Sequence, residues 1–246
     1  MAKFPKFFST DNPKSAKGYD LGWLNAINYM APDRTGLDVG TLCPDSSPGC
    51  RLLCLGMYSG QAAIVTDLEN GINAVRRSRI AKAQWFISDT QAFMAEVVQH
   101  IFAMKRKAER EAKKLAIRMN GSTDVPWERI RTDNGETLPQ RFPETQFVDY
   151  TKSVRRMLDQ KRAANYHLTF SLSETNRAEA ERVLAAGYNV AVVFGHGQPE
   201  TFMGHRVIDG TKHDLRHLDP EPVIVGLDPK GTKAKNDTSG FVVREY

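Results

Sequence analysis

Short apolar runs separated by polar stretches of helical spacing make up the second half of the chain. The helical stretches include residues 153–162 and 177–186, and Gly187 is suited to end the second one. Strands that alternate with helices favour a parallel sheet, and runs rich in Val, Ile and Phe are typical of strands buried on both faces. The runs that predict strands are residues 115–119, 146–150, 167–171, 190–194 and 223–227.

The first half adds one more strand and a long helical region. Residues 23–30 alternate well enough to form a strand. Residues 1–20 are interrupted by Pro and Gly and are expected to be an irregular arm. Residues 66–114 have helical spacing, with Asp89 as a cap for their second part. We therefore predict a single α/β domain over residues 21–246, built on a six-stranded parallel sheet that forms a partial (β/α)6 barrel.

Small, polar and ionisable residues follow each predicted strand. In parallel α/β folds the carboxyl ends of the strands meet at one edge, where ligands bind. We expect a site assembled there from loops on a rigid scaffold. The segments that follow the strands, in chain order, are a cysteine-rich loop and residues 120–124, 149–152, 171–174, 195–197 and 228–231.

The three cysteines of the chain, Cys43, Cys50 and Cys54, all fall in the loop after the first strand, with the spacing C-x6-C-x3-C. Three clustered cysteines favour a metal centre over ordinary thiols. A structural zinc would need a fourth ligand, and His213 and His217 are expected to be surface residues of a charged loop. A [4Fe–4S] cluster with three cysteine ligands leaves one iron open for a small-molecule ligand, and we favour it, with zinc as the alternative.

Composition limits the classes of protein that fit. The chain has 246 residues, 41% hydrophobic and 26% charged, which is typical of a folded domain. No apolar stretch is long enough to span a membrane, and the N-terminus has no secretory pattern, so we expect a cytoplasmic location and no membrane partner. A net charge of +5 permits a phosphate-bearing partner without requiring one.

Long segments across the chain resemble the phage-encoded gene product eighty-eight family. The resemblance implies a bacteriophage protein that works in the cytoplasm of an infected host cell. The segments that carry it are NPKSAKGYD, TLCPDSSPGCRLLC, IRMNGSTDVPWE, FVDYTK, NYHLTFSLSETN, NVAVVF, VIDGTKHDLRHLDP and VIVGLDPKG.

A cysteine triad after the first strand of a six-stranded partial barrel is also similar to the radical S-adenosylmethionine superfamily. That resemblance implies a [4Fe–4S] cluster whose open iron binds S-adenosylmethionine, and a redox or radical-enzyme role. The usual triad spacing there is C-x3-C-x2-C, and this chain departs from it. By position, the resemblance assigns cofactor binding to Asn120, Ser122, Asp124, Ser171, Ser173 and Glu174.

The strand-end residues Asp149, Lys152 and Glu174 could position a substrate, or could serve only to pair charges and support a helix start. The alternative function is nucleic-acid binding with a structural iron–sulfur or zinc site. Its support is two basic clusters, Arg76, Arg77, Arg79 and Lys82, and Lys152, Arg155, Arg156, Lys161 and Arg162.

Overall fold

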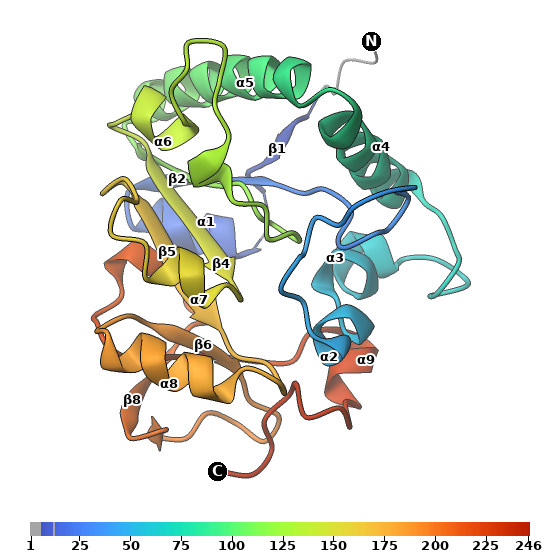
Figure 1. Ribbon diagram of the computed structural model, residues 1–246, viewed down its shortest axis with the longest axis vertical. Coiled ribbons are helices and arrows are strands. Elements are labelled where there is room, and N and C mark those ends of the chain that lie inside the picture. The colour runs from blue at the N-terminus through green and yellow to red at the C-terminus, as the bar shows by residue number, and fades with distance from the viewer. Residues whose placement is uncertain (1–5, 12) are drawn as a thin grey trace.

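The computed structural model describes residues 6–11 and 13–246, and in this part of the chain the strands form one nine-stranded mixed sheet (Figure 1). The strand order is β1-β2-β3-β4-β5-β6-β9-β8-β7. The strands are β1 (Phe8–Ser9), β2 (Trp23–Asn28), β3 (Lys114–Arg118), β4 (Gln146–Thr151), β5 (Tyr166–Ser171), β6 (Val190–Val193), β7 (Thr201–Phe202), β8 (His205–Asp209) and β9 (Ile224–Leu227).

The six strands predicted from the sequence are all present. They are β2, β3, β4, β5, β6 and β9, all parallel, and they lie in the sheet in their order along the chain. Every crossover therefore steps in the same direction, and right-handed crossovers then place the connecting helices on one face, as in a (β/α) barrel. The prediction of a single α/β domain with a partial barrel-like sheet is confirmed. The sheet stays open, with β1 and β7 at its two edges.

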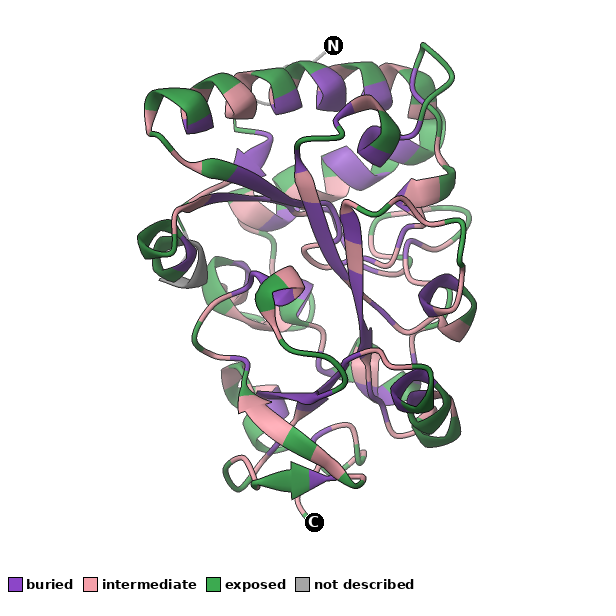
Figure 2. Cartoon of the chain, turned by 90° about the vertical axis from the view of Figure 1, so that its left-hand side faces the viewer, coloured by how far each residue is buried: buried purple, intermediate pink, exposed green. Residues whose placement is uncertain are grey.

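Helices on one face of the sheet bury the main core (Figure 2). Phe93, Val97 and Ile101 of α5 pack in the same cluster as Leu24 of β2 and Ile117 of β3. The helices are α1 (Pro13–Asp20), α2 (Pro48–Leu52), α3 (Leu55–Tyr58), α4 (Ala74–Ser88), α5 (Thr90–Arg110), α6 (Leu138–Arg141), α7 (Val154–Met157), α8 (Arg177–Ala185) and α9 (Gly231–Lys235), with short 3-10 turns η1 (Gly60–Ala63), η2 (Trp127–Arg129) and η3 (Arg216–Leu218).

Three predictions of local structure were wrong, and one element was missed. Residues 1–20 hold β1 and α1, and a helix that begins at a proline loses no hydrogen bond there; residues 1–5 and 12 lie outside the described residues. The helical region 66–114 is two helices, because the side chains of Asn73 and Asp89 each cap a new one. The predicted helix 153–162 is the single turn α7. The hairpin β7–β8 was not predicted, because its strands are short and exposed.

The other sheet face is covered by the segment around η3. The ring of His217 packs edge-on against Trp23 with centroids 4.6 Å apart, and both ring nitrogens are buried. His213 is half-buried, and Arg216 donates a hydrogen bond to its carbonyl oxygen. His213 and His217 were predicted to be surface residues, and both are half-buried, because the segment around η3 packs against the sheet.

Candidate functional site: a cysteine loop and a polar cavity

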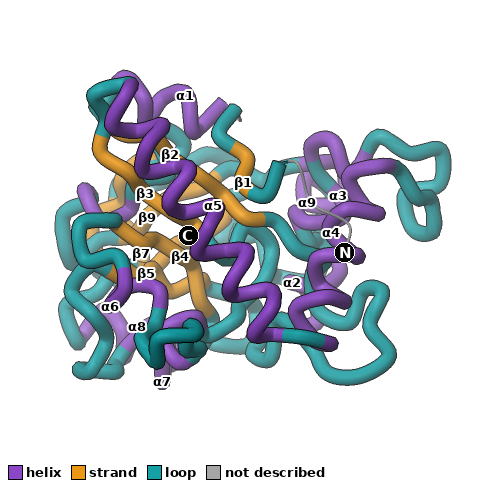
Figure 3. The backbone as a smooth tube through the Cα atoms, turned by 90° about the horizontal axis from the view of Figure 1, so that it is seen from above, coloured by secondary structure: helices purple, strands orange, loops and turns teal. Residues whose placement is uncertain are grey.

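The three cysteines lie in one loop over the carboxyl edge of the sheet. Cys43 follows β2, Cys50 lies in α2, and Cys54 is the residue before α3. Seen from above, α2, α3, α4 and α9 form a group beside the strands (Figure 3). The sulfur of Cys43 is 3.8 Å from the carbonyl oxygen of Ser122, which follows β3. The loop therefore lies where the strand-end segments meet.

Glu174, which follows β5, holds the start of α2. One of its carboxylate oxygens accepts a hydrogen bond from the Ser47 hydroxyl at 2.8 Å, and the other accepts one from the Gly49 N–H at 2.7 Å. The Ser47 hydroxyl oxygen in turn accepts a hydrogen bond from the Cys50 N–H at 3.1 Å. Sequence reasoning had placed Glu174 at a cofactor; the structure places it against the cysteine loop.

Close packing at two glycines fixes the loop further. A Cβ at Gly49 would lie 2.6 Å from the Ser239 hydroxyl and 2.8 Å from a Glu174 carboxylate oxygen. A Cβ at Gly56 would lie 2.6 Å from the Cβ of Ser122. Neither position has room for a side chain, so the cysteine loop approaches the strand ends at both places as closely as a backbone can.

Burial keeps two of the thiols protonated. It raises the pKa of Cys43 to about 12 and that of Cys54 to about 11. Backbone hydrogen bonds lower both pKa values in part. The Asp33 N–H donates to the Cys43 sulfur at 3.3 Å, and the N–H groups of Gly56 and Met57 favour the Cys54 thiolate. A charge on Cys50 would raise both pKa values, so the three sulfurs lie near enough to affect one another.

The segment after β3 is held largely by its own contacts. The Asn120 side chain is buried, and its oxygen accepts hydrogen bonds from Thr123, Val125 and Trp127. The Ser122 hydroxyl donates to the Met30 carbonyl oxygen at 2.6 Å. Among the residues predicted to bind a cofactor, these two are engaged in shaping the loop.

Asp149 faces the protein interior. It accepts hydrogen bonds from the Asn120 N–H at 2.7 Å and the Tyr166 hydroxyl at 2.7 Å, and burial raises the pKa of Asp149 to about 7. Asp149 does not pair with Lys152, whose ammonium donates to the Ser171 hydroxyl at 2.8 Å instead. The Lys152 charge is near enough to Cys54 to favour its thiolate.

Ser173 is buried in the turn before α8. Its N–H donates to the Asn176 side-chain oxygen at 2.7 Å, and its hydroxyl lies 3.4 Å from that of Thr175. The Asn176 side chain therefore holds Ser173 in place, and the turn leaves Thr175 exposed.

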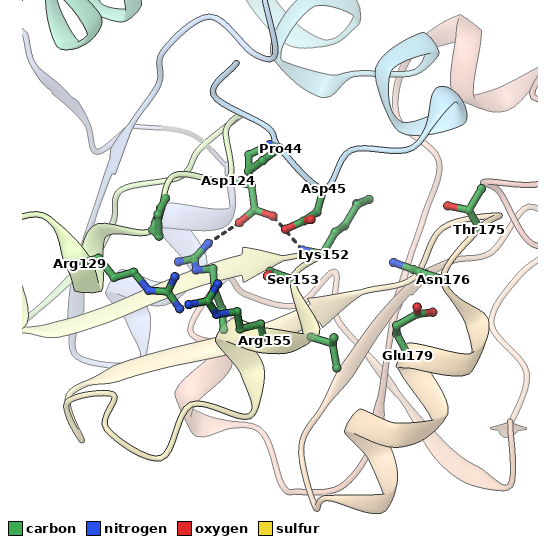
Figure 4. A pocket seen from close by; sticks show the side chains of 13 residues that line it. Pro44, Asp45, Asp124, Arg129, Lys152, Ser153, Arg155, Thr175, Asn176 and Glu179 are labelled. Atoms are coloured by element: carbon green, nitrogen blue, oxygen red, sulfur yellow. Dashed lines mark hydrogen bonds and ion pairs between the residues drawn. The ribbon is translucent and has the colours of Figure 1, made fainter. Parts of the chain in front are cut away.

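A cavity of about 520 Å³ opens beside the cysteine loop (Figure 4). Asp124 stands in its wall and pairs with the buried Arg156, while burial raises the pKa of Asp124. Sequence reasoning had identified Asp124 and Lys152 at the strand ends and Arg155 and Arg156 in a basic cluster, but it did not bring them together as one cavity. The other lining residues come from helix starts and turns with no motif. The lining residues are Pro44, Asp45, Asp124, Pro126, Arg129, Lys152, Ser153, Val154, Arg155, Arg156, Thr175, Asn176 and Glu179.

The two basic clusters are mostly turned inward. The Arg76 guanidinium is buried and donates to four backbone carbonyl oxygens, among them those of Ala62 and Met57, and Lys82 is buried beside Asn28. In the second cluster, Arg156 pairs with acidic residues and Arg162 donates to backbone carbonyl oxygens. These four side chains are engaged inside the protein, whereas Arg77, Arg155 and Lys161 of the same clusters are exposed. Nucleic-acid binding therefore stays a prediction that rests on the exposed members.

Within the described residues, no three His, Cys, Asp or Glu side chains are placed to hold a metal ion. No helix in that part of the chain is long and apolar enough to cross a bilayer.

Comparison with known proteins identifies the family. No curated protein and no solved structure matches the chain. The family described as Gene product 88 matches residues 6–245, which is nearly the whole chain. The protein therefore belongs to the Gene product 88 family.

Proposed function

We propose that this protein binds a [4Fe–4S] cluster through Cys43, Cys50 and Cys54. The observation that carries the proposal is the loop itself. It brings the only three thiols of the chain to the carboxyl edge of the sheet and is fixed there by Glu174 and two close glycine contacts. A loop held this rigidly around otherwise unreactive thiols is expected of a preformed ligand set.

The thiol environments fit a cluster. Buried thiols with raised pKa values stay neutral, and a bound metal centre removes their protons outright. The backbone N–H groups directed at Cys43 and Cys54 are the donors that stabilise cluster thiolates and set their potential.

A small molecule at the open iron is the second part of the proposal. Six parallel strands in chain order, with the cysteine loop after the first, are what a radical S-adenosylmethionine-like scaffold would provide. S-adenosylmethionine is therefore the first ligand to test. The spacing C-x6-C-x3-C differs from that of the superfamily, so cluster binding and cofactor binding are tested separately. Cluster binding needs only the three thiols, whereas cofactor binding also needs a matching pocket.

The test is anaerobic purification followed by a visible spectrum and assays of iron, sulfide and zinc on one sample. We expect a brown protein with broad absorption near ~400 nm and about four iron and four sulfide per chain. Cys43→Ala, Cys50→Ala and Cys54→Ala should each lose the colour. Leu52→Ala is the matched control, because Leu52 lies in the same loop and is 53% exposed.

Other results would redirect or overturn the proposal. A colourless protein with about one zinc would replace the cluster with a structural metal site. A protein that stays metal-free after anaerobic reconstitution would refute metal binding. If the cluster is present, a change in its electron paramagnetic resonance spectrum on adding S-adenosylmethionine supports the open iron, and an unchanged spectrum removes that ligand.

A further inference from the structure

We propose that the cavity beside the cysteine loop is a binding site for a small molecule that carries a phosphate or carboxylate at one end and hydroxyl groups at the other. Its volume of about 520 Å³ lies within the range of small-molecule sites. The inference concerns the arginines and carboxylates of this cavity and does not depend on the cluster.

One wall of the cavity presents two arginines whose charges are weakly matched: Arg155 has no carboxylate partner among the described residues, and Arg129 has a distant one. Arg155 is exposed and forms no hydrogen bond or ion pair with the described residues. The nearest carboxylate oxygen to Arg129 belongs to Asp159 at 4.0 Å, too long for a hydrogen bond. Both side chains reach the same side of the cavity (Figure 4). Two guanidinium groups with unused donors are the usual means of holding a phosphate or carboxylate.

The third arginine of this wall is held as a support. Arg156 is buried and donates to Glu128 at 2.7 Å and to the Tyr166 hydroxyl at 3.2 Å, besides its pair with Asp124. Its charge is therefore already balanced inside the protein. The Arg156 side chain fixes the turn from which Arg155 projects, so Arg155 is presented from a rigid base.

The opposite wall offers acceptors. Glu179 and Asp45 line the cavity and have no hydrogen bond or ion pair with the described residues. Figure 4 shows Thr175, Asn176 and Glu179 across from Arg129 and Arg155. Unpaired carboxylates facing an open cavity accept hydrogen bonds from ligand hydroxyl groups. The two walls together select a molecule with an anionic end and a hydroxyl-bearing end.

The cavity is preformed. The Lys152 N–H and the Thr151 hydroxyl both donate to Asp124, which ties the segment after β3 to the end of β4. The Asn176 amide donates to the Ser171 carbonyl oxygen at 3.1 Å and fixes the start of α8. Walls held by such contacts lose little conformational freedom when a ligand binds, which favours affinity.

Isothermal titration calorimetry of the purified full chain tests the proposal with three probes: ribose 5-phosphate, ribonate and ribose. We expect ribose 5-phosphate or ribonate to bind and ribose, which lacks the anionic end, to bind at least tenfold more weakly. Binding of the phosphate alone, or of the carboxylate alone, identifies the anionic group. If neither anion binds at concentrations up to about 10 mM, the proposal is wrong.

Variants locate the binding. Arg155→Gln and Arg129→Gln should each weaken the anionic probe by about tenfold to a hundredfold, because each removes a charge-assisted contact. Glu179→Gln should weaken binding of ribose 5-phosphate and leave unchanged the binding of inorganic phosphate, which is added as a fourth probe for this variant. Arg77→Gln is the matched control, since Arg77 is an exposed arginine of α4, outside the cavity lining. Equal affinity of Arg155→Gln, Arg129→Gln and Arg77→Gln would overturn the assignment.

Discussion

Replacing Glu174 should open the cysteine loop without unfolding the domain. In the structure this half-buried carboxylate accepts one hydrogen bond from Ser47 and one from the Gly49 N–H, at 2.8 and 2.7 Å. Glu174→Ala removes both acceptors and leaves the start of α2 with only the Ser47 cap on the Cys50 N–H. The helix has only five residues, so its own hydrogen bonds cannot hold it.

The size of the effect follows from the two bonds. A hydrogen bond to a charged group contributes about 1.5–3 kcal/mol, and water replaces part of it where the site is half-exposed. We therefore expect the free energy of opening the loop to fall by about 2–4 kcal/mol. At 1.4 kcal/mol per tenfold, the open population rises between about 30-fold and several-hundred-fold. The open population of Glu174→Gln should lie between those of wild type and Glu174→Ala, because the amide keeps one oxygen acceptor and its nitrogen cannot accept a hydrogen bond.

Limited trypsin digestion measures this opening at Arg51, an exposed residue inside α2. When opening is fast relative to cleavage, the cleavage rate follows the open population. Hydrogen exchange of the Gly49 amide gives the same quantity without a protease. Glu181→Gln is the control, because its side chain is 58% exposed and its ion pair with Arg177 contributes little. Wild-type cleavage and exchange rates in Glu174→Ala would refute the role assigned to Glu174.

Three further predictions concern ionisable groups. Because burial raises the pKa of Asp149 from 3.8 to about 7, its contribution to stability is full below pH 4 and is lost as the pH rises through 7. Between pH 4 and pH 8 the free energy of unfolding of the wild type should therefore fall by about 4 kcal/mol through this group, and Asp149→Asn should not show that fall. Urea unfolding at the two pH values measures it, and the same pH dependence in Asp149→Asn and wild type would contradict the prediction. Burial lowers the pKa of Lys82 from 10.5 to about 7, so its contribution is present above pH 10.5 and is lost as the pH falls through 7. The free energy of unfolding of Lys82→Met, taken relative to wild type, should therefore rise by about 4 kcal/mol when the pH is lowered from 10 to 6. No such rise would refute the cost of burying the Lys82 charge. Lys152→Met should raise the pKa of the Cys54 thiol and so slow its alkylation in metal-free protein by at least about twofold at pH 9. Mass spectrometry of the alkylated protein measures the rate, and equal rates in variant and wild type would show that the Lys152 charge has no effect.

The sheet could be predicted because each of its main strands is recognisable from the hydrophobic pattern of its own residues. Runs such as residues 190–194 are apolar on both faces, and only a strand inside a covered parallel sheet uses that pattern. The helices on the same chain were harder. Residues 66–114 have continuous helical spacing, and Asp89 was recognised as a cap within them. The cap at Asn73 was missed, because capping depends on which side-chain rotamers the fold allows.

The location of the candidate site could be predicted from the sequence, but the roles of its individual side chains mostly could not. The order of strands and the cysteine spacing placed Cys43, Cys50 and Cys54 with the strand ends. The function of a polar side chain there depends on its partners, which lie far along the chain: Glu174 meets Gly49, 125 residues away. No local pattern encodes such a pairing. For the same reason Arg129 was not identified and Arg155 was assigned only to a basic cluster, because the two side chains reach the same side of the cavity only in the folded chain.

The cysteine loop and the cavity share structural parts, so they should act together. Pro44 and Asp45 line the cavity and directly follow Cys43 in the chain. Lys152 contributes to both, because its side chain lines the cavity and its charge acts on Cys54. A ligand that neutralises positive charge in the cavity would weaken the field that favours the Cys54 thiolate. By linkage, any centre bound to the thiolates must then alter affinity for an anion in the cavity by the same factor. A metal centre and a small-molecule site built independently would have no reason to share a lysine and a loop.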